Sequence, residues 1–462
     1  MKINRRKYFK LIICDIAVSL ILLLPFTYRG VAKDGQPYAL QREYQTYMPV
    51  VFMSNYKESE GVPDPEFDSD GKVTTNINNS IFEGIRAIAV QNDRKIIAVG
   101  SFSDGINNGF ALVRYRPSGD LDTSYDYDGM VATYFPGGGA RAEAATIQSD
   151  GKIIAVGSTY NGVNDDYTLA RYNTDGSLDN SFHEDGLVFT DIGNRDQIAR
   201  GVALQPDGKI VIAGHDNNST CFTVLRYNQD GNLDTSFGIY GGWTTACFDY
   251  QSYVSAVALQ ADGKIVVAGS TEKSCYMDAM YALARFNPDG SPDENFDLDG
   301  RVVTDISSGM DYSRALTLQK DGKIVLVGSI EHSGFEDIAL ARYNSDGSLD
   351  TSFDGDGLTT TDLGNYSYDH GNAIAIQPNG KILVAGSTEY YDIVDFILIR
   401  YNTDGSLDAS FGDSGWVRTD FFGLTDQASA AAIQPDGKII IAGSAMEVAE
   451  QLSYIFAIAR YK

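Results

Sequence analysis

The sequence is dominated by a hairpin pattern that returns at nearly constant spacing. Its clearest copy is Gly201-Val-Ala-Leu-Gln-Pro-Asp-Gly-Lys-Ile-Val-Ile-Ala-Gly214, two apolar runs joined through Asp-Gly. Asp-Gly between such runs predicts a β-hairpin, because Gly accepts positive φ and Asp bonds the turn backbone. The glutamine before the turn recurs at steps of 57, 57, 55, 59, 58 and 57 residues, as Gln91, Gln148, Gln205, Gln260, Gln319, Gln377 and Gln434. A unit repeated at this period predicts a repeat architecture.

Each period predicts four short strands linked by turns. In the unit that starts at Phe182 they cover 187–190, 201–204, 210–213 and 221–227. The two middle strands are apolar on both faces, as expected for a sheet covered on both sides. We therefore predict an all-β fold, a seven-bladed β-propeller of four-stranded antiparallel blades over residues 61–462, in preference to an open β-solenoid. The strand 72–75 is expected to complete the last blade and so close the ring.

The N-terminal segment predicts export. Residues 1–27 combine a basic start with an apolar run, which is typical of a secretory signal or an uncleaved N-terminal anchor. Residues 28–60 show no period and are expected to be a linker, although 47–53 could be a docked strand. The predicted location is extracellular or at the cell envelope, with membrane contact only through an uncleaved N-terminal segment.

The net charge excludes one class of partner, and the cysteine positions predict one disulfide. The formal net charge is −26, which argues against nucleic acid as a partner because phosphate binding needs clustered Lys and Arg. A monomer is expected. Pairing Tyr227 with Gly241 on adjacent antiparallel strands places Cys221 opposite Cys247 and predicts a disulfide there. Cys275 is then left over.

The repeat resembles a known family. The pattern Gln-Pro-Asp-Gly-Lys-Ile, Ala-Gly-Ser and Arg-Tyr-Asn-x-Asp-Gly-Ser-Leu-Asp-x-Ser-Phe is similar to the delta-60 repeat of bacterial β-propellers, and Gln377–Ile382 and Arg400–Asp408 follow it closely. Departures include Asn92-Asp-Arg-Lys95, which lacks the turn Gly, and Tyr125 in place of Phe. The resemblance implies an extracellular or envelope repeat domain and carries over no catalytic motif.

An arginine and an aspartate recur once in every repeat. Equal counts predict one Arg–Asp pair per blade, of which a bidentate geometry is one form. A residue repeated in every blade is interpreted as structural. The arginines are Arg114, Arg171, Arg226, Arg285, Arg342, Arg400 and Arg460, and the aspartates are Asp64, Asp122, Asp179, Asp234, Asp293, Asp350 and Asp408.

Function is expected where the repeats differ. The residue five before each glutamine reads Arg86, Glu143, Arg200, Ser255, Arg314, Asn372 and Ser429. These residues are expected just before each inner strand, around one mouth of the central channel. Arg86, Glu143, Arg200, Arg314 and Asn372 are the predicted ligand-binding residues, and a plain solvated rim is the alternative. The variable loops, with Tyr160, His215, Lys273–Tyr276 and Tyr390–Asp392, form a second candidate surface for a glycan or protein.

Metal and catalytic signals are weak. Turns such as Asp126-Tyr-Asp128-Gly could bind calcium, but Asp-x-Asp-Gly is also ordinary turn chemistry, so no cofactor is predicted and calcium stays open. The four histidines share no metal-ligand spacing, and no nucleophile motif is present. We predict a binding or structural module for a protein or glycan at the cell surface. The alternative is an extracellular polysaccharide hydrolase or lyase that uses Glu143 with acids such as Asp311, Asp369 and Asp426.

Overall fold

A computed structural model describes residues 22–25, 47–50, 60–77, 80, 82–273, 278–364, 366–391, 393–448 and 452–462. The chain divides into two compact units, Met1–Glu58 and Ser59–Lys462. In the first unit, β1 (Leu22–Pro25) pairs antiparallel with β2 (Tyr47–Val50). The rest of the predicted signal or anchor (1–27), and all of the predicted linker (28–60) except β2 and Glu60, lie outside the described residues. Among the described helices and strands there is no helix with the length and apolarity needed to cross a membrane.

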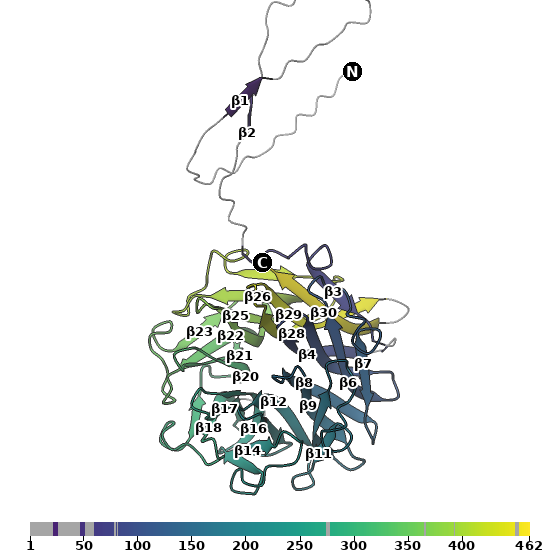
Figure 1. Cartoon of the computed structure of the whole chain (residues 1–462). Helices are drawn as coiled ribbons and strands as arrows, with labels where there is room; N and C mark the ends of the chain where they lie inside the picture. The colour runs from purple at the N-terminus through teal and green to yellow at the C-terminus, as the bar shows by residue number, and fades with distance from the viewer. Residues whose placement is uncertain are drawn as a thin grey trace, which may run out of the picture. The chain divides into compact units, whose positions relative to one another are not determined.

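The second unit is built from strands, and its described residues include no helix. Each repeat supplies an inner, a second, a third and an outer strand, and the blades follow one another around a common axis (Figure 1). The inner strands are β4 (Phe82–Val90), β8 (Gly139–Ile147), β12 (Gln197–Leu204), β16 (Gln251–Leu259), β20 (Asp311–Leu318), β24 (Tyr368–Ile376) and β28 (Asp426–Ile433). The second strands are β5 (Ile96–Ser103), β9 (Ile153–Tyr160), β13 (Ile210–Asp216), β17 (Ile265–Glu272), β21 (Ile324–His332), β25 (Ile382–Tyr390) and β29 (Ile439–Val448).

The third and outer strands complete the blades. The third strands are β6 (Asn108–Tyr115), β10 (Asp165–Tyr172), β14 (Cys221–Tyr227), β18 (Ala279–Phe286), β22 (Phe335–Tyr343), β26 (Ile393–Tyr401) and β30 (Leu452–Tyr461). The outer strands are β7 (Met130–Tyr134), β11 (Leu187–Thr190), β15 (Trp243–Cys247), β19 (Arg301–Thr304), β23 (Leu358–Thr361), β27 (Trp416–Thr419) and, from the start of the unit, β3 (Lys72–Thr75). The all-β fold of four-stranded antiparallel blades predicted from the sequence is confirmed.

The apolar middle strands form the core between successive blades. One cluster packs Ile97 and Leu112 of one blade against Ala142 and Ile153 of the next, and these four side chains are buried. Burying an aliphatic side chain of this size contributes roughly 1.5–3 kcal/mol, so the stacking of blade on blade is the main source of stability. This two-sided burial explains why the middle strands lack the apolar–polar alternation of a half-exposed sheet.

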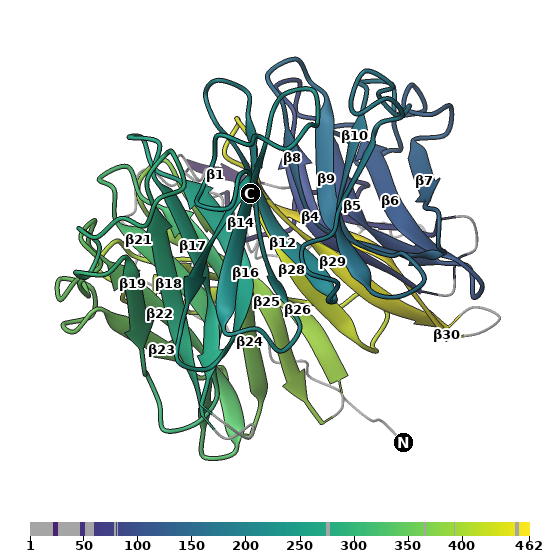
Figure 2. The same ribbon diagram turned by 90° about the horizontal axis from the view of Figure 1, so that it is seen from below.

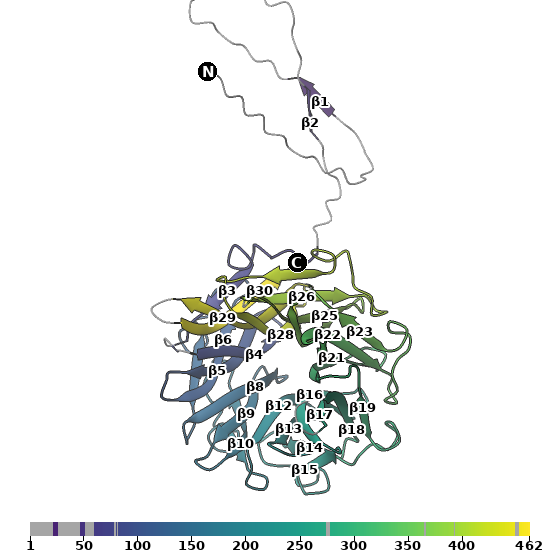
Figure 3. The same ribbon diagram turned by 180° about the vertical axis from the view of Figure 1, so that it is seen from behind.

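The two ends of the unit meet in one blade. β3 pairs antiparallel with β30, with Lys72 opposite Ala459 and Thr75 opposite Phe456. Figure 3 shows β3, at the start of the second unit, beside β30 at its end. Figure 2 shows β4 and β28, which are in contact, at the junction of the first and last blades. One parallel pairing, Tyr454 with Phe82, also joins β30 to β4, so these two four-stranded sets count as one eight-stranded sheet.

The same backbone hydrogen bond links each blade to the next. The N–H after each Ser-Phe or equivalent aromatic turn donates to a turn carbonyl of the following repeat, over 2.7–3.0 Å. For the last blade the donor is Asp68 and the acceptor is Ser118 of the first blade. For the sixth blade the donor is Gly412 and the acceptor is Glu60, which precedes β3. The remaining pairs are Asp126 to Asp175, His183 to Asp230, Gly238 to Asp289, Asp297 to Asp346 and Asp354 to Asp404.

The recurring arginine and aspartate form an ion pair in every repeat. The Arg Nε lies 2.6–2.8 Å from an Asp Oδ2 in each, including Arg460 with Asp64 at opposite ends of the unit. The guanidinium also covers the aromatic ring of its own turn, with its carbon 4.3–4.6 Å from the ring centre. The geometry is not the two-oxygen bidentate form, because a second nitrogen usually donates to the next repeat, as Arg226 does to the Pro288 carbonyl at 2.6 Å. The pair therefore joins neighbouring blades.

Candidate functional site: the channel between the inner strands

A β-bulge interrupts every inner strand at the same place. The pairing with the second strand skips one residue, for example between Ala199 and Gly201 in β12. A bulge re-aims the side chain of the extra residue. The seven skipped residues are Arg86, Glu143, Arg200, Ser255, Arg314, Asn372 and Ser429. They are the residues that the repeat comparison selected, and we call them the bulge ring.

The glycine of the Ala-Gly-Ser motif makes room for each bulge. A Cβ on Gly214 would lie 2.1 Å from the carbonyl oxygen of Ile198, and one on Gly386 would lie 1.7 Å from that of His370. The other five glycines at this position are equally crowded, with 1.8–1.9 Å to a carbonyl oxygen of the inner strand. The motif glycine is thus a steric requirement of the bulge.

All seven members of the bulge ring line a single cavity of about 1380 Å³ between the inner strands. The prediction that they lie just before the inner strands is wrong, because the strands begin three or four residues earlier, at Gln197 in β12 and Asp311 in β20, for example. The bulge is the reason, because it breaks the alternation of side chains along the strand. The residues before the bulge therefore do not continue the sequence pattern of the residues after it. The side chains belong to the channel wall inside the strands.

The bulge ring is cationic. Arg86, Arg200 and Arg314 are opposed by Glu143 alone within it, in a chain whose formal net charge is −26. The Glu143 Oε2 atom lies 2.7 Å from Arg200 Nη1 and 3.9 Å from Arg86 Nε. Arg314 is exposed and lines the channel, and its side chain makes no hydrogen bond or ion pair within the described part of the chain. It therefore offers free guanidinium donors to an anionic group.

The uncharged members of the ring are tied to the wall. Asn372 Nδ2 donates to the Ala428 carbonyl at 2.8 Å, and Ser255 Oγ donates to the Ala268 carbonyl at 3.2 Å. Ser429 Oγ donates to the carbonyl of Ile85. Of the five predicted ligand residues, the three arginines thus retain the most donor capacity.

Two residues before the bulge ring, a second set of side chains lines the cavity: Arg141, Tyr253, Tyr312, His370 and Gln427. The Tyr312 hydroxyl donates to Glu272 Oε1 at 2.8 Å, and burial together with this carboxylate raises the pKa of Tyr312 above its usual range. Sequence reasoning missed this set. The two-residue period of a strand could have found it, since side chains at such spacing share a face.

His215 lies in the channel wall rather than in an exposed loop. It is 3 % exposed, so its place in the predicted variable-loop surface is wrong; β13 extends through it to Asp216. Its Nδ1 accepts a hydrogen bond from the Val254 N–H at 3.2 Å. Burial, and to a smaller degree the Arg200 charge, lowers the pKa of His215 to about 3, so the ring is neutral. Tyr160, Tyr390 and Tyr391 of that surface are exposed, whereas 274–277 and Asp392 lie outside the described residues.

The three aspartates proposed to act with Glu143 in the enzyme alternative do not line the cavity. Asp311, Asp369 and Asp426 are fully buried, and each accepts a hydrogen bond from the backbone of the preceding loop, from Ile306, Leu363 and Phe421 respectively. Glu83 and Gln197 take the same position and role in their blades. Burial raises the pKa of Asp426 to about 6 and that of Glu83 to about 8. These side chains anchor loops.

The Asp-x-Asp-Gly turns behave as turns. The second aspartate accepts the N–H two residues on, as in Asp128 with Met130 at 2.8 Å and Asp356 with Leu358 at 2.9 Å. Among the described acids, those that gather closely enough to hold a metal ion come from other positions and include none of these turn aspartates.

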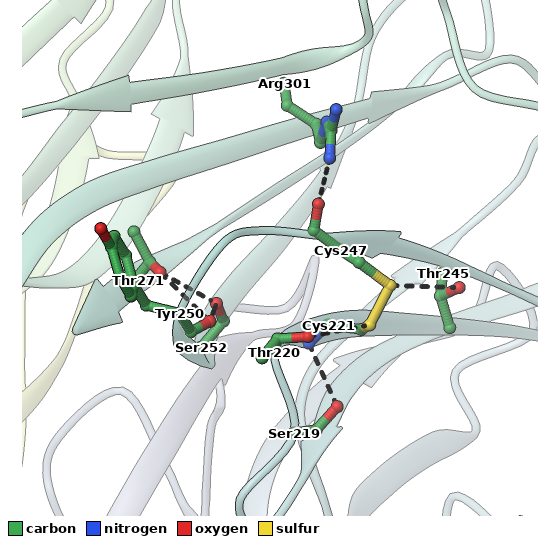
Figure 4. Close-up of a disulfide and its surroundings, with 9 residues drawn as sticks. All are labelled: Ser219, Thr220, Cys221, Thr245, Cys247, Tyr250, Ser252, Thr271 and Arg301. Atoms are coloured by element: carbon green, nitrogen blue, oxygen red, sulfur yellow. Dashed lines mark hydrogen bonds between the residues drawn. A yellow bond between two sulfur atoms is a disulfide. The ribbon is translucent and has the colours of Figure 1, made fainter. Parts of the chain in front are cut away.

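Cys221 and Cys247 face each other on β14 and β15 and form a disulfide (Figure 4). The pairing register agrees with the one that the sequence predicts. Cys247 also accepts a hydrogen bond at its carbonyl from Arg301 of the next blade. The disulfide links the third and outer strands of one blade, beside the loop that leads to β16.

A family profile described as "Domain of unknown function (DUF5122) beta-propeller" matches the chain over eight segments, which together cover just over half of it. Segments 260–276 and 279–296 fall within one period, so the segments follow the seven repeats read from the sequence. The other segments are 91–125, 148–182, 205–237, 319–353, 377–411 and 434–461. No curated protein matches the chain.

Solved structures resemble the chain at low identity. A protein of unknown function from Dyadobacter fermentans is 13% identical with a TM-score of 0.45, covering 85% of this chain and 98% of its own. The propeller domain of the Trilobed protease from Pyrococcus furiosus is 11% identical with a TM-score of 0.43, covering 82% and 94%. The polysaccharide lyase Uly1 is 11% identical with a TM-score of 0.44, covering 81% and 89%. At these scores none of them bears on function.

Proposed function

The chain belongs to the DUF5122 β-propeller family, and we propose that it is an exported binding module whose channel takes an acidic glycan. The observation that carries this proposal is the bulge ring, in which three arginines face one glutamate in a strongly acidic protein. The same bulge position in each repeat places these side chains in one cavity. Carboxylate groups match arginine geometrically and electrostatically.

The rest of the cavity suits a sugar better than a small anion. Its volume of about 1380 Å³ exceeds that of typical small-molecule pockets, about 300–1,000 Å³. Tyr253 and Tyr312 supply aromatic surface beside the arginines, and Gln427 supplies polar groups. An oligosaccharide that bears uronic acids combines the carboxylates, hydroxyls and apolar ring faces that this lining would contact.

The proposal includes the fold in its finer form, a closed seven-bladed ring of the delta-60 type. Support for closure comes from the pairing of β3 with β30 and from the seven equivalent hydrogen bonds between successive blades, the last of which joins Asp68 to Ser118. A closed ring encircles the channel, so the bulge ring would surround a bound ligand.

Export and a monomeric state are further parts of the proposal. The disulfide between Cys221 and Cys247 supports an oxidising compartment outside the cytoplasm. N-terminal sequencing and thiol mapping of protein recovered from the cell envelope and the medium test this. An intact N-terminus with both cysteines reduced in every fraction would contradict export.

Calorimetric titration with oligogalacturonate tests the binding function, with the neutral reduced oligosaccharide as the comparison ligand. We expect the acidic ligand to bind and Arg314→Ala to weaken it by roughly ten- to a hundred-fold, as for loss of a charged hydrogen bond worth about 1.5–3 kcal/mol. Arg195→Ala is the matched control, since Arg195 is exposed, lies outside the cavity, and its side chain makes no hydrogen bond or ion pair to a described residue; its backbone carbonyl, which accepts from Asn164, is unchanged by the substitution. Equal binding of neutral and acidic ligands would refute the proposal.

The enzyme alternative gives a different outcome in the same experiment. Of the carboxylates that were proposed for catalysis, only Glu143 lines the cavity, and it forms an ion pair with Arg200. Glycoside hydrolysis by the usual route needs a second carboxyl group across the bond. Chromatography of the oligogalacturonate after incubation would detect cleavage, and cleavage that is lost in Glu143→Gln would favour an enzyme over a binding module.

A further inference from the structure

Three blades carry different residue pairs at one edge, where the third strand begins and the outer strand ends. In the blade of β14 and β15, Cys221 faces Cys247 at this point and the two are joined covalently. In the blade of β26 and β27, the last registered pair is Phe396 with Thr419, so the next residues on the two strands are Asp395 and Asp420. The blade of β22 and β23 places Asp337 and Asp362 in the same way, next to the pair Ile338 and Thr361.

A third aspartate joins each acidic pair from the inner strand of the following blade. Asp395 and Asp420 are joined by Asp426 of β28, and this set is called the Asp395 cluster. Asp337 and Asp362 are joined by Asp369 of β24 to form the Asp337 cluster. In each set one carboxylate oxygen from each of the three aspartates lies within 4.8 Å of the other two. In the disulfide blade the corresponding third residue is Ser252, which is drawn beside the disulfide in Figure 4.

The Asp395 cluster contains buried carboxylate oxygens without a partner. Asp395 and Asp426 are both 0 % exposed. Asp426 Oδ2 accepts the Phe421 N–H at 2.7 Å and Asp395 Oδ2 accepts from Arg418, but the Oδ1 atom of each has no hydrogen-bond donor among the described residues. A buried charged acceptor without a partner raises the free energy of the folded state. A cation between the acids would satisfy both of these oxygens.

The Asp337 cluster is better satisfied from within. Asp369 Oδ1 accepts from the Thr388 hydroxyl at 2.5 Å, and its Oδ2 accepts from the Leu363 N–H at 2.8 Å and the Ser367 hydroxyl at 3.0 Å. The comparison singles out the Asp395 cluster as the stronger site.

The charges of the Asp395 cluster fit a divalent ion. Arg418 forms an ion pair with Asp395 and offsets one of three negative charges. Lys72 donates to the backbone carbonyl of Asp420 at 3.1 Å rather than to its carboxylate. Two negative charges therefore remain, and carboxylate oxygens are the ligands that Ca²⁺ prefers.

We infer that the Asp395 cluster binds Ca²⁺. The ion would join β26, the loop after β27 and β28 of the next blade, at the position where another blade has its disulfide. Because Asp420 is exposed, water can complete the six to eight oxygen ligands that Ca²⁺ takes. The site is separate from the channel and does not depend on the glycan proposal.

Calorimetric titration of the chelator-treated full chain with CaCl₂ tests the inference, with melting temperature as a second readout. We expect the parent to bind Ca²⁺ and to melt at a higher temperature than in EDTA. Asp420→Asn should weaken binding at least about tenfold, or about 1.4 kcal/mol. An Asn at this position keeps the acceptor that Asp420 offers to the Gly423 N–H, so the loop should persist.

Two controls keep the result interpretable. Asp249→Asn removes an aspartate that is also exposed, from the corresponding loop of the disulfide blade, and should bind Ca²⁺ like the parent. Asp362→Asn should leave the binding to the Asp395 cluster intact. The inference is overturned if the parent shows neither binding nor a rise in melting temperature, if Asp420→Asn titrates like the parent, or if binding is lost in Asp362→Asn alone.

Discussion

Replacing Arg226 by Leu should lower the stability of the propeller. It should leave the channel unchanged, because Arg226 does not line the cavity. Arg226 Nε donates to Asp234 Oδ2 at 2.8 Å, Nη1 donates to the Pro288 carbonyl of the next repeat at 2.6 Å, and the guanidinium lies 4.5 Å from the Phe237 ring centre. The side chains of Arg226 and Asp234 are 9% and 8% exposed, so solvent does not replace these contacts. The substitution removes all three.

The size of the effect follows from what remains around Asp234. Breaking a buried ion pair by removing one partner typically costs about 3–5 kcal/mol. Here Lys209 Nζ still lies 2.8 Å from Asp234 Oδ2, and the Ser236 hydroxyl still donates to Oδ1 at 2.6 Å, so we expect the lower end. A loss of about 3 kcal/mol, at an unfolding entropy of about 2.1 cal/mol/K per residue over roughly 400 residues, lowers the melting temperature by about 3–4 °C.

Differential scanning calorimetry of the parent, Arg226→Leu and Arg195→Leu measures this. The side chain of the exposed Arg195 makes no hydrogen bond or ion pair to a described residue, so its variant should lie within about 0.5 kcal/mol of the parent. Asp234→Asn should cost more than Arg226→Leu, because it leaves both Arg226 and Lys209 without their carboxylate. If Arg226→Leu has the same melting temperature as the parent, the claim that this repeated ion pair stabilises the blades is refuted.

Two further changes probe the blade's buried polar groups and its bulge. Burial raises the pKa of Glu83 to about 8, so between pH 4.5 and 8 the folded state holds the extra proton and stability should fall as pH rises, by up to about 1.4 kcal/mol per unit. Glu83→Gln, which copies Gln197, should therefore raise the melting temperature at pH 9 but not at pH 5, and an equal shift at both would contradict this. Gly214→Ala should cost several kcal/mol or prevent folding, because its Cβ would lie 2.1 Å from the Ile198 carbonyl. Gly364→Ala, with no neighbour closer than 4.0 Å, should be tolerated, and equal melting temperatures for the two variants would show that the bulge does not need its glycine.

The repeat carries enough information to predict the fold. A period of about 57 residues, Asp-Gly hairpins and strands apolar on both faces predict antiparallel blades stacked on each other, and those are what the chain forms. The alignment of repeats also predicts the facing of Cys221 and Cys247, since a strand register needs only one anchoring pair. The extent of the inner strands could not be predicted, because the bulge at residues such as Arg200 breaks the two-residue alternation.

The site was predictable in position but not in composition. Comparing repeats selects the bulge ring, because each blade offers one variable residue there. It assigns His215 to a loop surface instead of the channel wall, and it misses Glu272, which also reaches the cavity from a second strand. It also misses the Asp395 cluster, whose acids come from two blades. Such groupings depend on which strands become neighbours, and that is a property of the folded chain rather than of any one segment.

The most direct test of the channel as a binding site is a crystal structure of the protein soaked with oligogalacturonate. The ligand should lie in the cavity with its carboxylates within hydrogen-bond distance of Arg314 and of at least one of Arg86 and Arg200. A ligand bound only on the outer loops, near Tyr390 and Tyr391, or a channel without ligand at a saturating concentration, would contradict the account.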